Sequence, residues 1–323
     1  MRLTFIGGTG RSGTSITRKL LGCSEDVATL PFEHRILIDP DGPIEFFEAL
    51  DKYRDPYKMD LAIHRMFNHL NALDSSSIFK SLTDNVIKRN AFLSNRFNLS
   101  RYSGWKLSDT FRNYPAAVKK FQSRLELLTY KGRWAGSPGY VFNNRMHHFS
   151  IDEKESFVSA LHEFYYSLVT NLLQAKCRKH FVEDSTWNMT HLKSLSQVFP
   201  QAKFVHVYRD PRDVVSSFMR QRWMPNEVSQ VVNIYQSLIT DILDKTAKNK
   251  NCYSLKFENL VENKDAELSS LCAFLDLDYS DEMRSFKLQN GNIGRYRDDF
   301  DNEKISYLNY ELAPQIEVLG YAK

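Results

Sequence analysis

The segment Leu3-Thr-Phe-Ile-Gly-Gly-Thr-Gly-Arg-Ser-Gly-Thr-Ser15 decides the fold of this 323-residue chain. Its apolar start, Leu3 to Ile6, is typical of a short buried strand, and the pattern from about Thr14 to Leu21 indicates a helix that ends at Gly22. The loop between them is rich in glycine. A strand, a glycine-rich loop and a helix in this order predict a phosphate-binding turn.

The loop has the glycine spacing of a Walker A loop but not its lysine. Gly8 and Gly13 bracket four residues, and Thr14 stands where the lysine would be. Since that lysine reaches the β- and γ-phosphates, its absence argues against ordinary cleavage of ATP or GTP. Backbone N–H groups and the positive end of the helix dipole still make an anion site. The residues expected to bind phosphate are Gly10, Arg11, Ser12, Gly13, Thr14 and Ser15.

Two later segments repeat the order of strand and helix. Lys203–Tyr208 predicts a strand that leads through Arg209-Asp-Pro-Arg into a helix starting near Asp213. The apolar stretch Cys252–Phe257 precedes a helix over about Lys264–Leu275. Strands that alternate with helices predict an α/β fold, with a P-loop-like parallel sheet flanked by helices on both faces.

Residues 42–150 have a different character, with amphipathic stretches such as Ile63–Leu73 and Ala116–Leu128. We interpret this region as a mostly helical insertion that shapes a substrate pocket. Because no low-complexity linker separates it from the rest, we expect residues 1–323 to form a single domain.

Composition excludes several classes of protein. Lys+Arg 43 minus Asp+Glu 39 gives a net charge of +4 without a block of like charges, which argues against a nucleic-acid partner. The four cysteines contain no CxxC pair and no histidine pair has a zinc-ligand spacing, so neither disulfides nor a metal is expected. No run of about 18 apolar residues and no signal peptide is recognisable, which favours a cytoplasmic protein without a membrane span.

Two of these segments carry a resemblance to a known family. Thr9–Ser15 resembles the 5′-phosphosulfate loop of sulfotransferases that use 3′-phosphoadenosine 5′-phosphosulfate (PAPS). Arg209–Ser217 resembles their 3′-phosphate segment, an arginine at a strand end with a serine eight residues later. Gly291–Tyr296 resembles the closing nucleotide loop, and Leu312–Tyr321 resembles the final helix of bacterial members. The resemblance covers most of the chain and is weakest over 42–150.

The resemblance implies PAPS as the co-substrate, 3′-phosphoadenosine 5′-phosphate (PAP) as the product, and no metal. It places Arg11 on the phosphosulfate, and Arg209, Ser217 and Arg295 on the 3′-phosphate side. An arginine fork suits phosphate because guanidinium bonds its oxygens in bidentate fashion. The acceptor stays open between a carbohydrate, a lipid, a phenol and a peptide tyrosine.

The neighbours of Arg209 allow other interpretations. Arg209 could instead form an ion pair with Asp210 or Asp213. Arg212 fits a solvated helix position equally well. Ser216 lies about 100° around the helix from the next residue, so we expect it to face elsewhere.

Sulfuryl transfer needs a base that takes the proton of the acceptor. Pro31-Phe-Glu-His-Arg35 contains a Glu-x-Arg pattern that resembles tyrosylprotein sulfotransferases, in which the glutamate is the base. Glu33 is therefore the first candidate for the base. Small-molecule sulfotransferases use a histidine, which keeps His34, His147 and His148 as alternatives.

The sequence departs from the family pattern at two places. Phe257 stands where many cytosolic members have a tyrosine that contacts adenine, and Glu183–Asn188 stands where many relatives have a lysine-threonine-proline segment. The family's usual lysine is therefore missing there, which leaves open whether Lys106 or Asp184 replaces it. Two other functions stay open, a P-loop nucleotide kinase and a non-catalytic PAP-binding module.

Overall fold

A computed structural model of the chain describes residues 1–53, 55–74, 105–125, 127–136, 145–150, 154–288 and 292–322. It divides into two compact units, which we describe separately. The sheet unit comprises residues 1–33, 177–196 and 201–323, and the helical unit comprises residues 34–176 and 197–200. The single-domain organisation of residues 1–323 stays a prediction.

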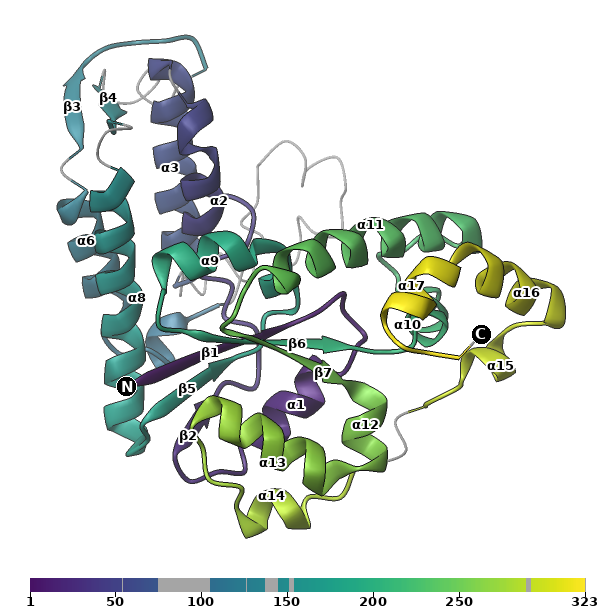
Figure 1. The fold of residues 1–323 in the computed structure, drawn as a ribbon. Helices are drawn as coiled ribbons and strands as arrows, with labels where there is room; N and C mark the ends of the chain where they lie inside the picture. The colour runs from purple at the N-terminus through teal and green to yellow at the C-terminus, as the bar shows by residue number, and fades with distance from the viewer. Residues whose placement is uncertain are drawn as a thin grey trace, which may run out of the picture. The chain divides into compact units, whose positions relative to one another are not determined.

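A parallel sheet of five strands forms the centre of the sheet unit (Figure 1). The strand order is β2-β5-β1-β6-β7, so the first strand of the chain is also the middle strand of the sheet. Thr4 of β1 is opposite Val182 on one side and Lys203 on the other. The strands are β1 (Arg2–Gly7), β2 (Val27–Thr29), β5 (His180–Glu183), β6 (Lys203–Tyr208) and β7 (Cys252–Lys256).

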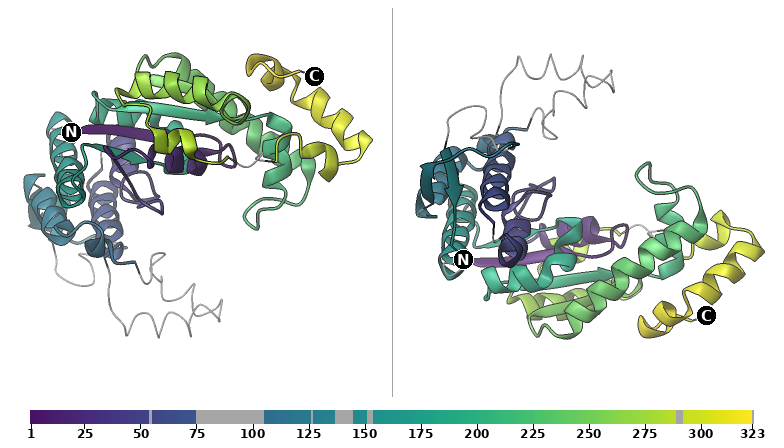
Figure 2. Two further views of the ribbon diagram at one scale, coloured as in Figure 1. Left: turned by 90° about the horizontal axis from the view of Figure 1, so that it is seen from below. Right: turned by 90° about the horizontal axis from the view of Figure 1, so that it is seen from above.

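Helices cover both faces of this sheet, as the alternating pattern predicted. Figure 1 shows α11 on one face and α1, α12 and α13 on the other, and the views of Figure 2 agree. Buried side chains of α1, α12 and α13 pack with valines and leucines of the strands into one core. The helices of this unit are α1 (Thr14–Leu21), η4 (Thr186–His191), α9 (Leu192–Val198, whose last two residues are assigned to the helical unit), α10 (Pro211–Phe218), α11 (Val228–Ala247), α12 (Phe257–Glu262), α13 (Lys264–Leu275), α14 (Asp281–Ser285), α15 (Tyr296–Asp299), α16 (Asn302–Glu311) and α17 (Ala313–Val318).

Local sequence explains where the two helices next to the loops begin and end. Helix α1 ends at its C-cap residue Gly22, whose N–H bonds back to the last turn. Helix α10 begins at Pro211 behind an aspartate cap, since the Asp210 side chain accepts a hydrogen bond from the N–H of Arg212. The predictions of strand 203–208 and of helix 264–275 are confirmed at both ends.

The helical unit is built around long helices that share an aromatic core. The ring of Phe121 on α6 stacks on that of Phe164 on α8, with centroids 5.0 Å apart. The predicted helix 116–128 is wrong at its end, because the chain leaves α6 at Arg124 and enters a strand at Leu128. The elements are α2 (Pro43–Ala49), η1 (Leu50–Lys52), α3 (Pro56–Ala72), η2 (Leu107–Asp109), α6 (Tyr114–Arg124), α8 (Lys154–Lys176) and the antiparallel pair β3 (Leu128–Lys131) and β4 (Arg145–His148).

The described part of the chain contains no helix that is both long and apolar enough to span a bilayer.

Candidate active site

The glycine-rich loop between β1 and α1 depends on left-handed backbone conformations. Gly10, Arg11 and Gly13 have φ values of 85°, 58° and 109°. At Gly13 there is a second constraint, because a Cβ atom there would lie 2.4 Å from the ring of Phe257. Gly13 is also the N-cap residue of α1 and makes no side-chain cap hydrogen bond. No side chain caps this helix start, and the N–H of Ile16 bonds to the carbonyl oxygen of Gly13. An uncapped helix start of this kind suits an anion.

Ser12 points its hydroxyl into the loop itself. The side chain is fully buried, and its Oγ has no hydrogen-bond partner in the described part of the protein. A Cβ atom on Gly8 would come within 2.5 Å of this oxygen, so the loop closes tightly around it. Thr14 and Ser15 follow as the first two residues of α1. A buried hydroxyl without a protein partner fits a loop that binds phosphate oxygens.

Arg11 connects this loop to the second predicted segment. Its Nε donates a hydrogen bond of 3.0 Å to Oγ of Ser217, near the end of α10. The structure thus brings together two candidate residues that are far apart in the sequence. Arg11 lies in the loop after β1 and Ser217 in the helix that follows β6, and these two strands are neighbours in the sheet. Open parallel sheets bind ligands at the carboxyl ends of their strands.

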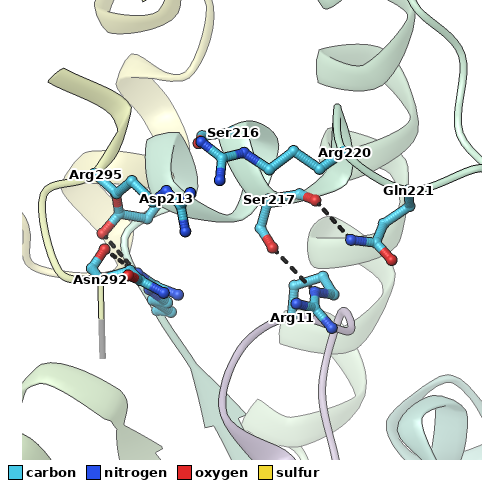
Figure 3. A pocket seen from close by; sticks show the side chains of 9 residues that line it. Arg11, Asp213, Ser216, Ser217, Arg220, Gln221, Asn292 and Arg295 are labelled. Atoms are coloured by element: carbon cyan, nitrogen blue, oxygen red, sulfur yellow. Dashed lines mark hydrogen bonds and ion pairs between the residues drawn. The ribbon is translucent and has the colours of Figure 1, made fainter. Parts of the chain in front are cut away.

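A pocket of about 110 Å³ lies at this junction (Figure 3). Four arginines but only one carboxylate are among its lining side chains, so it suits an anion. Three of the predicted binding residues, together with Arg11, are found in it. The lining residues are Arg11, Arg209, Asp213, Ser216, Ser217, Arg220, Gln221, Asn292 and Arg295.

Arg209 is held in place on several sides. Its Nη2 donates to Oδ2 of Asp213 at 3.1 Å and to the carbonyl oxygen of Asn292 at 2.6 Å. The guanidinium group also lies over the ring of Phe257, 5.3 Å from its centroid. The Nε atom is buried and has no hydrogen-bond partner within the described residues. Arg209 is therefore fixed by the protein and still has a donor available.

Arg212 is not the solvated helix residue that the sequence allowed. Its side chain is buried and makes a two-point ion pair with Asp210, with bonds of 3.0 and 2.7 Å. It also donates to Asn309 and to the carbonyl oxygen of Ala322. Arg212 therefore fastens the C-terminal segment to the start of α10, which is a structural role.

Asp213 is a site residue that the sequence analysis considered only as an ion-pair partner. Besides Arg209, its carboxylate accepts hydrogen bonds from the N–H groups of Gly294 at 2.8 Å and Tyr296 at 3.1 Å. The Asp213 side chain is buried. Asp213 thereby fixes the predicted closing loop, residues 292–296, against α10.

Asp299 arranges the other side of the pocket. It accepts hydrogen bonds from Ser216 and Arg220, and Nε of Arg295 lies 3.6 Å from its carboxylate. The expectation that Ser216 faces away from the pocket is therefore wrong. Because α15 lies beside α10, a side chain one position before Ser217 also reaches the pocket wall.

Glu33 lies close to the phosphate loop, and Thr186 connects the two. Oε1 of Glu33 accepts hydrogen bonds from the N–H of Thr186 at 3.1 Å and from its hydroxyl at 2.7 Å. The carbonyl oxygen of Thr186 accepts from the N–H of Gly8 at 3.0 Å. The methyl group of Thr186 lies over Gly10, where an added Cβ atom would be 3.2 Å away. One threonine thus positions Glu33 beside the loop.

The segment 183–188 holds two buried carboxyl groups. Asp184 forms an ion pair with Arg18, whose Nε donates to its Oδ2 at 2.7 Å. Burial raises the pKa of Asp184, and Arg18 opposes that shift. Glu183 accepts a hydrogen bond from the N–H of Ser185 at 2.8 Å and a further one from Asn188. Burial raises its pKa from 4.5 to about 7.

The raised pKa of Glu183 predicts a pH dependence of stability. A carboxyl group with a higher pKa in the folded state stabilises the protein fully below its unfolded pKa, and this contribution is lost as the pH rises. As the pKa rises from 4.5 in the unfolded chain to about 7 in the folded one, this lost stability amounts to about 3 kcal/mol. The free energy of unfolding, measured with urea, should therefore be lower at pH 8 than at pH 5, and this difference should shrink in Glu183→Gln. The exposed Glu25→Gln is the control; an unchanged difference in Glu183→Gln would contradict the assignment.

The remaining candidates lie in the helical unit. His34 is buried, with its Nδ1 accepting from the N–H of Ile36 and its Nε2 bonded to the hydroxyl of Tyr165 at 2.8 Å. Burial lowers the pKa of His34 to about 3. Lys106 pairs with Asp109 at 2.7 Å. His147 and His148 are consecutive residues of β4.

Comparison with known proteins gives a family and several solved structures. A family model described as the sulfotransferase family matches residues 4–281. The chain is similar to the sulfotransferase domain from the curacin biosynthetic pathway, with 14% identity, 99% of this chain and 98% of that chain covered, and a TM-score of 0.48. It is also similar to sulfotransferase STF9 from Mycobacterium avium, with 12% identity, 100% and 78% covered, and a TM-score of 0.48. No curated protein matches the chain in sequence. Because the family match extends over most of its length, the chain belongs to the sulfotransferase family.

Proposed function

We propose that this protein transfers the sulfuryl group of PAPS to a hydroxyl or amine acceptor. Family membership supports sulfuryl transfer in general. The donor, the roles of the site residues and the class of acceptor are our inference. The observation that carries it is the arginine-rich pocket beside the phosphate loop, joined to that loop by the bond between Arg11 and Ser217.

The pocket suits the 3′-phosphate that distinguishes PAPS from ATP. The Nε atom of Arg209 is buried and has no hydrogen-bond partner in the described residues. Because Asp213 already holds the side chain, Nε could donate to a phosphate without a change of side-chain conformation. Ser217 and Arg295 come from opposite sides of the same pocket. A dianionic phosphate would satisfy Arg209 and add a second acceptor for Arg295.

The loop suits the 5′-phosphosulfate. In the reaction an acceptor oxygen or nitrogen forms a bond to sulfur while the bond from sulfur to the 5′-phosphate oxygen breaks. Negative charge then grows on the leaving phosphate. The N–H groups of Thr14 and Ser15 at the start of α1, the hydroxyl of Ser12 and the guanidinium group of Arg11 are the donors that would stabilise it. No lysine follows Gly13 to help in this, since Thr14 takes that position.

Glu33 is the proposed general base. The hydrogen bonds from Thr186 hold its carboxylate next to the loop, where the acceptor must meet the sulfuryl group. As the acceptor attacks, its proton passes to Glu33, and PAP leaves with the electrons of the broken bond. Asp184 is a weaker candidate because Arg18 already pairs with it.

Retention on immobilised PAP tests the choice of donor. The protein should bind the resin without added metal and elute with free PAP but not with ATP at the same concentration. Equal elution by ATP, or retention only with Mg²⁺, would favour a nucleotide kinase instead. A protein that elutes correctly but transfers no radiolabel from PAPS to any acceptor of the classes above would favour a non-catalytic PAP-binding module.

A further inference from the structure

Three potential metal ligands meet in the helical unit, which contains none of the residues proposed to bind the donor. Asp60 and His64 lie one turn apart on α3, so their side chains share a face of that helix. His147 comes from β4, which packs against α3. One ligand atom from each of the three side chains lies within 4.8 Å of the others.

The distances fit a bound transition-metal ion. Oδ1 of Asp60 is 3.5 Å from Nε2 of His64 and 3.4 Å from Nδ1 of His147. Zinc binds histidine nitrogen and carboxylate oxygen at about 2.1 Å, so two ligands of a tetrahedral zinc ion are about 3.4 Å apart. Both separations therefore agree with the edge of a zinc tetrahedron.

The polar atoms of this cluster are poorly satisfied by the protein. Oδ2 of Asp60, Nε2 of His64 and Nδ1 of His147 are all buried, and none has a hydrogen-bond partner in the described ranges of the chain. Asp60 itself has a fully buried side chain. Its Oδ1 accepts the N–H of His147 at 2.7 Å, which orients the carboxylate and leaves further lone pairs. Three buried polar atoms without hydrogen bonds in one place call for an explanation, and a bound ion is one that would satisfy them together.

We propose that Asp60, His64 and His147 bind a divalent transition-metal ion, with zinc as the preferred ion. Two imidazole nitrogens and one carboxylate suit zinc, whereas Ca²⁺ and Mg²⁺ prefer oxygen ligands alone. The histidine side chains are 25% and 20% exposed, which lets an ion enter and a water complete the coordination. The ion would tie β4 to α3 and so stabilise the helical unit.

The site is tested by metal binding to the full chain, prepared without a histidine tag. The protein is treated with EDTA, dialysed into chelator-free buffer at pH 7.5 and titrated with ZnCl₂ by calorimetry. One zinc ion should bind per chain, and the melting temperature should rise with zinc concentration, since binding to the folded state alone stabilises it. Co²⁺ in place of zinc should give the visible absorption of a tetrahedral site.

Matched variants separate this site from incidental binding. His64→Ala and His147→Ala should each weaken zinc binding at least tenfold and remove the thermal shift. His148→Ala changes the next residue of the same strand, which is outside the cluster, and should bind zinc like the unchanged protein. Far-UV circular dichroism and a cooperative thermal melt report that each variant is folded. A folded protein that binds no zinc at micromolar concentration, or equal affinity in His64→Ala and His148→Ala, overturns the proposal.

Discussion

Glu33→Gln should lower the turnover of sulfuryl transfer about 10²–10⁴-fold, the usual contribution of a positioned proton acceptor. Glutamine keeps the shape of the side chain, and its oxygen can still accept from the N–H and hydroxyl of Thr186. It cannot take up the proton. The affinity for PAP should stay nearly unchanged, because the pocket residues are not altered. Turnover with radiolabelled PAPS, beside calorimetry with PAP, measures both quantities.

Thr186→Val is the matched control for this variant. It removes one of the two hydrogen bonds to Glu33 and keeps the backbone N–H, so turnover should fall by a smaller factor than in Glu33→Gln. If Glu33→Gln keeps near wild-type turnover between pH 6 and 8, the base lies elsewhere. His147 and His148 would then be tested before His34, whose two ring nitrogens already have partners inside the protein.

Arg209→Ala should weaken PAP binding by about 1.5–3 kcal/mol, the typical effect of losing a charge-assisted hydrogen bond. This corresponds to roughly 10–150-fold in the dissociation constant. The melting temperature should also fall, because Asp213 keeps its hydrogen bonds from Gly294 and Tyr296 but loses its buried ion pair. Calorimetry with PAP gives the affinity, and a thermal melt gives the stability.

Arg212→Ala provides the contrast three residues further on. Arg212 bonds to Asp210, Asn309 and Ala322, so its removal should lower the melting temperature more than it changes the intrinsic affinity for PAP. The two arginines are similar in burial and differ in partners. Unchanged PAP affinity in Arg209→Ala would refute the assignment of the 3′-phosphate to this pocket.

The parts of the fold that sequence predicts well are those with local signals. The first strand, its loop and α1 have an apolar run, spaced glycines and a terminal glycine, and all three appear as expected. Strands β2 and β5 are only three and four residues long, which is too short to show the alternation of apolar and polar residues that indicates a strand. In the helical unit β4 reads Arg-Met-His-His, which has no alternation of apolar and polar residues that would indicate a strand.

The sequence narrows the partners of the site residues but does not choose between them. It left Asp210 and Asp213 open as ion-pair partners of Arg209, and only the folded chain shows that Arg209 pairs with Asp213 and Arg212 with Asp210. The role of Asp213 depends on the N–H groups of Gly294 and Tyr296, which lie far along the chain. The cluster of Asp60, His64 and His147 likewise joins a helix to a distant strand, and spacing rules for metal ligands consider only near neighbours.

The central position of β1 has a consequence for synthesis on the ribosome. Both sheet neighbours of β1, β5 and β6, begin only at residues 180 and 203. At roughly 5–20 residues per second, translation needs about 10–40 s to reach them. During that interval β1 is an apolar strand with two open edges, which favours aggregation or capture by chaperones. The arginine-rich pocket also includes Asn292 and Arg295, so nascent chains acquire it only after nearly all of the chain has been synthesised.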